Sequence, residues 1–274
     1  MSRVLVTGGS MGIGRACARH LAESGWQVAV AARGAGAVEE TVAALPGEGH
    51  VGVRLDVSDP GGWDEALAGI DSLSALVCAA GVIGPIGRLG TYSPEDFVRT
   101  VEINLFGTWL AVNACLPLLR ESRGAVVTFS GGGATSPLPR FDGYAASKAA
   151  VVRLTENLAR DLAGDGVRLN SVAPGFVVTR MHEATVEAGP DAAGSGYFET
   201  TQRQVAEGGV PPERAAALVD FLVSNDAEGI TGKLISAPWD PWEDEEFRAR
   251  LRSEPDLATL RRIDDHFFTA ATEQ

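Results

Sequence analysis

Residues 4–14 read Val-Leu-Val-Thr-Gly-Gly-Ser-Met-Gly-Ile-Gly. The apolar run at residues 4–7 is typical of a buried β-strand, and a helical pattern begins directly after the glycines. In a glycine-rich turn between a strand and a helix, backbone amides can face an anion because no side chain blocks the approach. Gly8, Gly12 and Gly14 fit this role. The stretch therefore predicts an α/β sheet whose first strand carries a site for a dinucleotide pyrophosphate.

The same alternation of strand and helix continues along most of the chain. Strand-like runs lie at residues 4–7, 27–32, 50–55, 75–77, 125–129, 168–172 and 234–236. Helical patterns cover residues 12–24, 94–119, 143–162 and 212–224. Several strands lack polar residues at alternate positions, as expected of parallel strands that are buried on both faces. The predicted fold class is α/β: a single-domain, Rossmann-like, doubly wound parallel sheet with helices on both faces.

Two segments depart from this alternation. Residues 182–209 are rich in Gly, Ala, Glu and Thr and lie between a strand and a helix, where a mobile substrate lid is expected. Residues 239–274 form a C-terminal extension, which we expect to pack on the same domain or on a partner subunit. The main domain accordingly spans residues 1–238 and includes the lid.

Composition and charge restrict the classes of partner. A net charge of -13 argues against nucleic acid and against anionic membranes, since both attract basic surfaces. No apolar run approaches the roughly 20 residues that span a bilayer, and no leader segment precedes the first strand. We therefore expect a cytoplasmic protein that binds a small molecule, with neither nucleic acid nor a membrane as partner.

Cysteines and histidines predict neither a disulfide framework nor a metal site. The three cysteines are odd in number and lie in apolar surroundings, which is typical of reduced core thiols. They are Cys17, Cys78 and Cys115. The four histidines, His20, His50, His182 and His266, show no metal-ligand spacing.

The end of the second strand indicates the type of cofactor. A site for NAD usually places an acid here for the ribose 2′-hydroxyl, whereas NADP requires a cation for the 2′-phosphate. Arg33 occupies this position, and the next acid is Glu39. We therefore expect NADP(H) as the cofactor, ahead of NAD(H).

Tyr144 and Lys148 stand four residues apart in a helical pattern and therefore lie on one face of that helix. A tyrosine with the ordinary pKa of about 10 is a weak base at neutral pH. A neighbouring ammonium stabilises the phenolate and lowers this pKa, which makes the phenol usable as a general acid and base. The pair predicts proton transfer to or from a carbonyl or an alcohol.

These motifs together resemble the short-chain dehydrogenase/reductase family over residues 2–237. The glycine loop, Asp56-Val57 after the third strand, Tyr144 with Lys148, and Pro174-Gly175 after the sixth strand follow in the family's order. The resemblance implies a cofactor site formed by Gly8, Ser10, Met11, Gly12, Ile13, Gly14, Arg33, Asp56, Val57, Ala80, Gly81, Tyr144, Lys148, Pro174, Gly175, Val177 and Thr179. It also implies that Lys148 holds the nicotinamide ribose and that Asn104 supports a water-linked proton path to this lysine.

Two positions depart from the family pattern. The family's Asn-Asn-Ala-Gly turn is here Cys78-Ala79-Ala80-Gly81. The family's catalytic serine is expected thirteen residues before the tyrosine, where this chain has Gly131. Adjacent strand residues point to opposite faces, but the three glycines at 131–133 would permit a bulge that re-aims the neighbouring Ser130. We therefore predict Ser130 as the substrate-binding hydroxyl, with Thr135 or Ser136 as substitutes.

The resemblance implies an NADP(H)-dependent oxidoreductase that interconverts a ketone and a secondary alcohol. The implied catalytic residues are Tyr144, Lys148, Asn104 and Ser130. Alternatives are an acyl or polyketide ketoreductase, an epimerase, or a non-catalytic NADP-binding sensor. The extension adds a hypothesis of its own, because Trp239 and Trp242 stand among carboxylates that would suit a sugar or amino-sugar-like substrate. The alternative is that these tryptophans only pack the extension onto the protein.

The resemblance also implies a homodimer or homotetramer, since members of the family commonly pair two of their helices. The helical patterns at 94–119 and 143–162 have more apolar surface than a sheet-facing stripe requires. The surplus residues include Leu110, Ala111, Ala149, Val151 and Val152.

Overall fold

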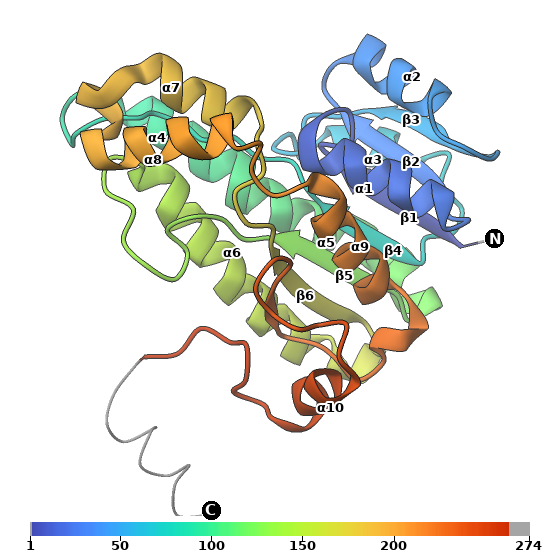
Figure 1. Ribbon diagram of the computed structural model, residues 1–274. Helices are drawn as coiled ribbons and strands as arrows, with labels where there is room; N and C mark the ends of the chain where they lie inside the picture. The colour runs from blue at the N-terminus through green and yellow to red at the C-terminus, as the bar shows by residue number, and fades with distance from the viewer. Residues whose placement is uncertain (1, 263–274) are drawn as a thin grey trace, which may run out of the picture.

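The computed structural model describes residues 2–262 and shows a parallel sheet of seven strands with helices on both faces (Figure 1). The strands are β1 (Arg3–Thr7), β2 (Gln27–Ala32), β3 (Val51–Arg54), β4 (Ala75–Cys78), β5 (Ala125–Phe129), β6 (Arg168–Ala173) and β7 (Leu234–Ser236). Their order in the sheet is β3-β2-β1-β4-β5-β6-β7. The strand order reverses between β1 and β4, and in such sheets a ligand binds at this point, beyond the carboxyl ends of the strands. The predicted doubly wound fold is confirmed.

Ten α-helices are described. They are α1 (Gly12–Glu23), α2 (Ala35–Ala43), α3 (Gly62–Leu67), α4 (Pro94–Val101), α5 (Gly107–Ser122), α6 (Asp142–Asp161), α7 (Arg180–Ala193), α8 (Ser195–Ala206), α9 (Pro212–Val223) and α10 (Glu245–Ser253). Three short turns complete the set: the π-turn η1 (Glu102–Phe106) and the 3₁₀ turns η2 (Ala163–Asp165) and η3 (Asn225–Ala227).

Two apolar layers hold the helices to the sheet. On one face, α1 and α9 pack against side chains such as Val4, Val30 and Val127. On the other face, α3 and α5 pack against side chains such as Leu5 and Leu76. Because both faces of each central strand are covered, those strands are apolar throughout, as their sequences indicated.

Residues 94–119 lie within one continuous helical run, Pro94–Ser122, as their pattern predicted, but a π-turn interrupts its α-helical repeat. The run divides into α4, the π-turn η1 and α5. A π-turn inserts an extra residue into the helical repeat and is frequent at functional sites. Five further helices were not anticipated: α2, α3, α7, α8 and α10. The predicted lid segment is therefore mostly helical.

The expectation that no segment is long and apolar enough to span a membrane is corrected by the same helical run. Residues Pro94–Ser122 are long and apolar enough to cross a membrane by length and composition, whereas the sequence suggested no such run. In the structure, Leu110, Cys115 and Leu119 of this run are buried against the sheet. A core helix passes the same test of length and hydropathy, so the run is weak evidence for a membrane span.

The apolar residues proposed for subunit contacts are mostly core residues. Leu110, Ala111, Val151 and Val152 are all buried within one chain, because they face the sheet or a neighbouring helix. The exposed large apolar side chains of α4, η1 and α5 are instead Val98, Phe106 and Trp109.

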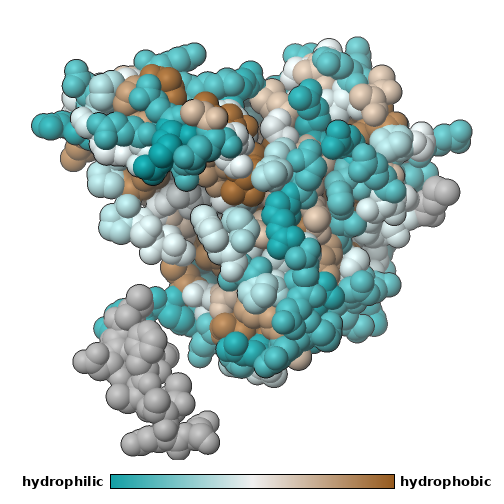
Figure 2. All heavy atoms as spheres, in the orientation of Figure 1, coloured by the Kyte–Doolittle hydropathy of each residue, from teal (hydrophilic) through white to brown (hydrophobic). Residues whose placement is uncertain are grey.

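Helices α7 and α8 lie together at one end of the molecule, above α4 and α6 (Figure 1). Figure 2 shows a notch between these two helices and the part of the molecule that contains α1 and α2, with hydrophobic side chains at its base. The carboxyl ends of the strands open toward this notch. The site predicted from the sequence therefore lies between a cofactor half and a lid half.

The described part of the extension packs on its own chain. Trp242 is 4% exposed, stacks near Phe221 and donates a hydrogen bond from Nε1 to the carbonyl oxygen of Ala237 (3.0 Å). The guanidinium of Arg214 lies 4.7 Å from the Trp242 ring centre. Trp239, in contrast, is 75% exposed. Of the two tryptophans, Trp242 therefore has the structural role. The rest of the extension, residues 263–274, lies outside the described residues.

Candidate active site

The glycine loop is shaped by close backbone contacts. Gly8 has a φ of 65°, and a Cβ there would lie 2.7 Å from the Cα of Ala80. A Cβ on Gly14 would lie 2.3 Å from the carbonyl oxygen of Gly8. Only glycine tolerates both the positive φ and this crowding. The loop therefore brings β1, β4 and the start of α1 together at the point where the strand order reverses.

The start of α1 is available to an anion. Its N-cap residue Met11 makes no side-chain cap, so the first-turn amides keep their donors free among the described residues. Ser10 is buried behind the loop, and Ile13 packs against the apolar layer of α1. An uncapped helix start next to a glycine turn fits a pyrophosphate, because the helix dipole favours negative charge there.

The second and third strands end beside an open depression of about 750 Å³. Arg33 and Arg54 both line it, so two guanidinium groups are available to one ligand. Asp56 lies on the same rim and accepts hydrogen bonds from Ser58 (2.6 Å) and from Arg99 (2.9 Å). Burial alone would raise the pKa of Asp56, but these hydrogen bonds and the Arg99 charge hold it below its usual value. The neighbouring Val57 is buried against Gly107.

Tyr144 and Lys148 lie in the first turns of α6, with the ammonium nitrogen 5.9 Å from the centre of the phenol ring. Lys148 is buried, and its Nζ donates a hydrogen bond to the carbonyl oxygen of Phe129 (2.9 Å). Burial lowers the pKa of Lys148 to about 8. The helical spacing thus places both groups on one face, as the sequence indicated.

The expected direction of the Tyr144 pKa is wrong for this structure. Burial raises the pKa of Tyr144 well above its usual value, and the phenol of Tyr197 raises it further. The reason is that the ammonium of Lys148 contacts the Phe129 carbonyl instead of the phenolate position, so desolvation of the phenol dominates. A neutral phenol is a proton donor, which is the form that carbonyl reduction requires.

Asn104 lies in the π-turn and links two segments of the site. Its Oδ1 accepts from the amide of Val82 (2.8 Å), and its Nδ2 donates to the Val82 carbonyl (2.9 Å) and to Ser147 Oγ (3.0 Å). Oδ1 and Lys148 Nζ both border Gly81, at 3.2 and 3.7 Å from the position of a Cβ there. Asn104 therefore joins the turn after β4 to α6, whereas the predicted water path to Lys148 stays a prediction.

The residue that faces the Tyr144 hydroxyl is Gly131. A Cβ on Gly131 would lie 2.2 Å from Tyr144 Oη. Ser130 is buried, and its amide donates to the carbonyl oxygen of Val172 (2.9 Å). The positive φ of this loop falls at Gly133 (87°), beyond the position where a bulge would re-aim Ser130. No hydroxyl of Ser130 is placed against Tyr144 among the described contacts, and its role stays a prediction. The substitutes Thr135 and Ser136 are exposed.

The turn after β6 contributes the last predicted segment. Gly175 has a φ of 78° and lies under the ring of Pro238, so the start of the extension closes over the Pro174–Gly175 turn. Val177 is buried, and Thr179 immediately precedes α7. The hydroxyl of Thr179 lies 3.4 Å from His182 Nδ1.

Sequence reasoning missed three residues of this region. Arg180 reaches the glycine loop and contacts Met11, which joins the lid to the cofactor half. His182 packs on Phe176, with ring centres 3.9 Å apart. Tyr197 of α8 packs edge-on against Phe141, which directly precedes the helix that carries Tyr144. These contacts join residues that are distant in the chain, so no local pattern could have revealed them.

The described residues contain no cluster of His, Cys, Asp and Glu that could hold a metal ion. The three cysteines are free and buried, as the sequence predicted. Burial raises the pKa of Cys78 to about 12, so this thiol near Lys148 remains neutral.

Comparison with known proteins gives consistent matches over this region. A family model described as enoyl-(acyl carrier protein) reductase matches residues 8–237. The chain is 34% identical over 240 residues to dehydrogenase/reductase SDR family member 4 of Sus scrofa, covering 84% of each chain. It is 33% identical over 237 residues to the 3-oxoacyl-(acyl-carrier-protein) reductase MabA of Mycobacterium tuberculosis, covering 85% of this chain and 89% of that protein. A solved structure described as a short chain dehydrogenase/reductase family protein has a TM-score of 0.73 and 30% identity, covering 86% and 94% of the two chains.

Proposed function

The chain belongs to the short-chain dehydrogenase/reductase family, and from this membership we propose that it is an NADP(H)-dependent oxidoreductase that interconverts a ketone and a secondary alcohol. The observation that carries the proposal is Tyr144, a phenol held beside a buried ammonium at the carboxyl edge of the sheet. Hydride transfer to a carbonyl requires a proton for the oxygen, and a neutral phenol packed against Gly131 can supply it.

The residues present fit a dinucleotide. Gly8 and Gly14 allow the close backbone packing that shapes the loop, and the uncapped start of α1 offers amide donors. Lys148 makes one hydrogen bond among the described residues, so its other donors suit the hydroxyls of a ribose. Bound NADP(H) would supply or accept the hydride. The protein's own contribution is to orient the carbonyl, to donate the proton from Tyr144, and to hold the cofactor.

The preference for NADP(H) is supported by Arg33 and Arg54. Both guanidinium groups line the depression beside the second and third strands, where an acid would favour NAD(H) instead. We expect Arg33→Ala to weaken NADPH binding about 10-fold or more. NADH binding should change little, because NADH lacks the 2′-phosphate that the Arg33 guanidinium would bind. Fluorescence titration with both cofactors measures this, and Arg88→Ala, an exposed arginine elsewhere, is the matched control. Equal affinity of the wild type for NADPH and NADH would contradict the preference.

Oxidation of NADPH with a panel of carbonyl compounds tests the activity itself. The panel should contain simple ketones, vicinal diketones, keto sugars and amino ketones, and it should be followed by absorbance. Consumption of NADPH that depends on the ketone supports the proposal. A protein that binds NADPH tightly but reduces no member of the panel would favour the alternative of a non-catalytic NADP-binding sensor.

A second candidate is the reduction of a 3-oxoacyl thioester. It is favoured by the likeness to MabA, whose name states this substrate class. The charge of the lid opposes it, because residues 182–209 contain five acids and a single arginine, and a phosphopantetheine carries a phosphate. Adding acetoacetyl-coenzyme A to the panel decides between the two. A thioester that is reduced more efficiently than every simple ketone would establish the second candidate.

We also propose a homodimer or homotetramer, now based on different residues. Phe106 and Trp109 stack with ring centres 6.0 Å apart, and each is 40% exposed. With Val98 they form an exposed apolar patch on α4, η1 and α5, which a second copy of the chain would cover. Sedimentation of the wild type and of Trp109→Glu tests this, and a wild type that is monomeric at micromolar concentration would contradict it.

A further inference from the structure

At the end of β5, no hydroxyl is placed against the phenol of Tyr144 among the described contacts. A Cβ at Gly131 would lie only 2.2 Å from Tyr144 Oη and 2.8 Å from Cζ, so the phenol rests directly on the Gly131 backbone. No side chain can occupy that place unless Tyr144 moves. A carbonyl oxygen that gains negative charge during reduction is stabilised best by two donors. The structure must therefore provide the second donor from elsewhere, or the reaction proceeds with one.

The lid brings another phenol to this place. Tyr197 lies in the first turn of α8, and its ring meets the ring of Phe141 edge-on, with centres 4.9 Å apart and an interplanar angle of 62°. Phe141 is completely buried and directly precedes α6, whose first turn carries Tyr144. The ring of Tyr197 is therefore held against the start of the helix that positions the proton donor.

The lid is attached to the same loop by a second contact. The guanidinium of Arg140 donates hydrogen bonds to the carbonyl oxygens of Asp191 and Ala192 at the end of α7. The same side chain lies 3.1 Å from where a Cβ of Gly194 would be, and Gly194 joins α7 to α8. Two adjacent residues, Arg140 and Phe141, thus hold the start of α8 in place. Tyr197 is not on a free loop, and the position of its ring against Phe141 is built into the fold.

We propose that Tyr197 is a second catalytic hydroxyl, which donates a hydrogen bond to the substrate carbonyl oxygen that Tyr144 protonates. This inference rests on the proposed reductase function. Tyr197 then takes the part that Ser130 was predicted to play, and it comes from the lid instead of from β5. The phenol is half-buried, so it can reach a ligand in the notch while its ring remains packed.

The electrostatics of Tyr197 agree with this arrangement. Burial raises the pKa of Tyr197 above its usual value, against a hydrogen bond from Thr201 that lowers it, so its hydroxyl keeps its proton at neutral pH and can act as a donor. A lid that supplies a catalytic donor links the reaction to lid position, because an open lid would remove the second hydrogen bond.

The substitution Tyr197→Phe tests the proposal, because it removes the hydroxyl and keeps the ring on Phe141. With 1-phenyl-1,2-propanedione as the probe ketone, or the best ketone of the panel, we expect kcat/KM to fall about 100-fold, as for loss of one oxyanion donor. The melting temperature and the dissociation constant for NADPH should remain those of the wild type. Tyr92→Phe is the matched control, since it removes a phenol hydroxyl bound to Asp142 on the same helical turn as Tyr144.

A second measurement does not depend on turnover. Infrared spectra of the ¹³C-labelled ketone bound with NADP⁺, which cannot reduce it, report hydrogen bonding to the carbonyl oxygen. We expect the carbonyl stretch to shift to lower frequency on binding to the wild type, and to shift less in Tyr197→Phe. If Tyr197→Phe leaves both the kcat/KM and the infrared shift at wild-type values, the role of Tyr197 is overturned while the reductase function stands. A wild type that neither binds nor reduces any ketone would overturn both.

Discussion

The chain contains only two lysines, Lys148 and Lys233. Their hydrogen bonds differ, because one lysine belongs to the proposed active site and the other holds the fold together. Lys148 and Lys233 are 6% and 4% exposed. Among residues 2–262, Lys148 gives one hydrogen bond, to the carbonyl oxygen of Phe129. Lys233 gives three, to the carbonyl oxygens of Glu254 (2.6 Å), Pro255 (3.2 Å) and Leu257 (3.0 Å). An ammonium has three donors, so Lys233 is saturated and Lys148 is not.

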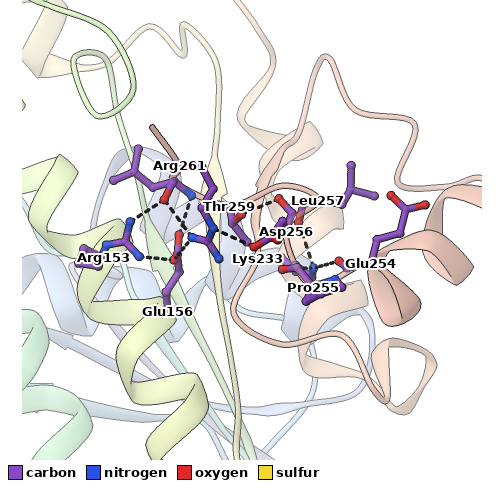
Figure 3. Close-up of polar contacts among 10 residues, drawn as sticks. Arg153, Glu156, Lys233, Glu254, Pro255, Asp256, Leu257, Thr259 and Arg261 are labelled. Carbon is purple, nitrogen blue, oxygen red and sulfur yellow. Dashed lines mark hydrogen bonds and ion pairs between the residues drawn. The ribbon is translucent and has the colours of Figure 1, made fainter. Parts of the chain in front are cut away.

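Lys233 fastens the extension to the edge of the sheet. Figure 3 shows its ammonium among the carbonyl groups of residues 254–257, next to a second cluster around Glu156. In that cluster the Glu156 carboxylate accepts from Arg153 (2.5 Å), from Arg261 (2.8 Å) and from the amide of Leu260 (2.6 Å). The amide of Leu234 in β7 also donates to the carbonyl oxygen of Ala258. The extension therefore covers the open edge of β7, which would otherwise be free to pair with another strand.

The comparison shows two uses of a buried charge. Where the charge has a structural role, the chain satisfies every donor. Where it serves the proposed reaction, the chain leaves donors free and accepts the energetic cost, because a ligand must complete them. Four predictions test this contrast between the two buried lysines and their surroundings, from the largest expected effect to the smallest.

Tyr144→Phe should have the largest effect and should act on turnover alone. Loss of the proton donor is expected to lower kcat about 1000-fold, while the melting temperature and NADPH affinity remain close to those of the wild type. Steady-state kinetics and a cofactor titration measure both. Retention of more than a few per cent of the wild-type kcat would remove Tyr144 from the proposed chemistry.

Lys233→Met should act on stability alone. Three carbonyl oxygens lose a charged donor, and relief of the burial that lowers the pKa of Lys233 offsets part of that loss. We expect the free energy of unfolding to fall by about 3 kcal/mol in total. The extension should detach first, so trypsin should cleave after Arg252 and Arg261 faster than in the wild type. The kcat and KM should change less than about 2-fold. A variant that is as stable as the wild type would show that the three hydrogen bonds contribute nothing net.

Lys148→Met should raise the free energy of unfolding, whereas Lys233→Met should lower it. Because the folded-state pKa of about 8 lies below the ordinary value of 10.5, folding disfavours the charged amine, and this penalty is fully present below pH 8. Such a shift is worth about 3 kcal/mol at pH 7, and loss of the Phe129 hydrogen bond costs about 1 kcal/mol. We therefore expect the inactive variant to be about 2 kcal/mol more stable at pH 7.

The pH dependence provides the check for Lys148→Met. In the wild type the unfolded state binds more protons than the folded state between pH 8 and 10.5, so this group makes stability rise with pH there. The advantage of the variant should therefore shrink to near zero at about pH 9.5. Chemical denaturation at both pH values measures this. An advantage that does not depend on pH would show that packing, and not the buried charge, is responsible.

Trp239→Ala should have the smallest effect, because the ring is 75% exposed. We expect less than about 0.5 kcal/mol change in the free energy of unfolding, whereas Trp242→Ala should cost about 3 kcal/mol by opening a cavity. The carboxylates near them are already engaged: Glu243 pairs with Arg214, and Asp240 accepts from the amide of Ser236. The sugar hypothesis therefore depends on Trp239 alone. A KM for keto sugars that is unchanged by Trp239→Ala would end it.

The elements that repeat a local pattern were predicted well. Strands 27–32, 125–129 and 234–236 have the bounds that their apolar runs indicated. The run at 94–119 is helical throughout, but its pattern did not indicate the π-turn at Glu102–Phe106, where Asn104 contacts Val82 and Ser147. The extension gave no periodic pattern, yet α10 forms there, with Asp244 accepting from the Glu246 amide as its cap.

The sequence by itself determined the strand–glycine–helix unit, the parallel sheet, and the placement of Tyr144 and Lys148 on one helical face. Each of these depends on residues a few positions apart, whose backbone geometry is the same in any surroundings. Only the tertiary structure decided that Gly131 lies against Tyr144, that Tyr197 comes from the lid, and that burial raises the Tyr144 pKa. Those properties depend on packing and desolvation between distant segments, which a local pattern does not encode.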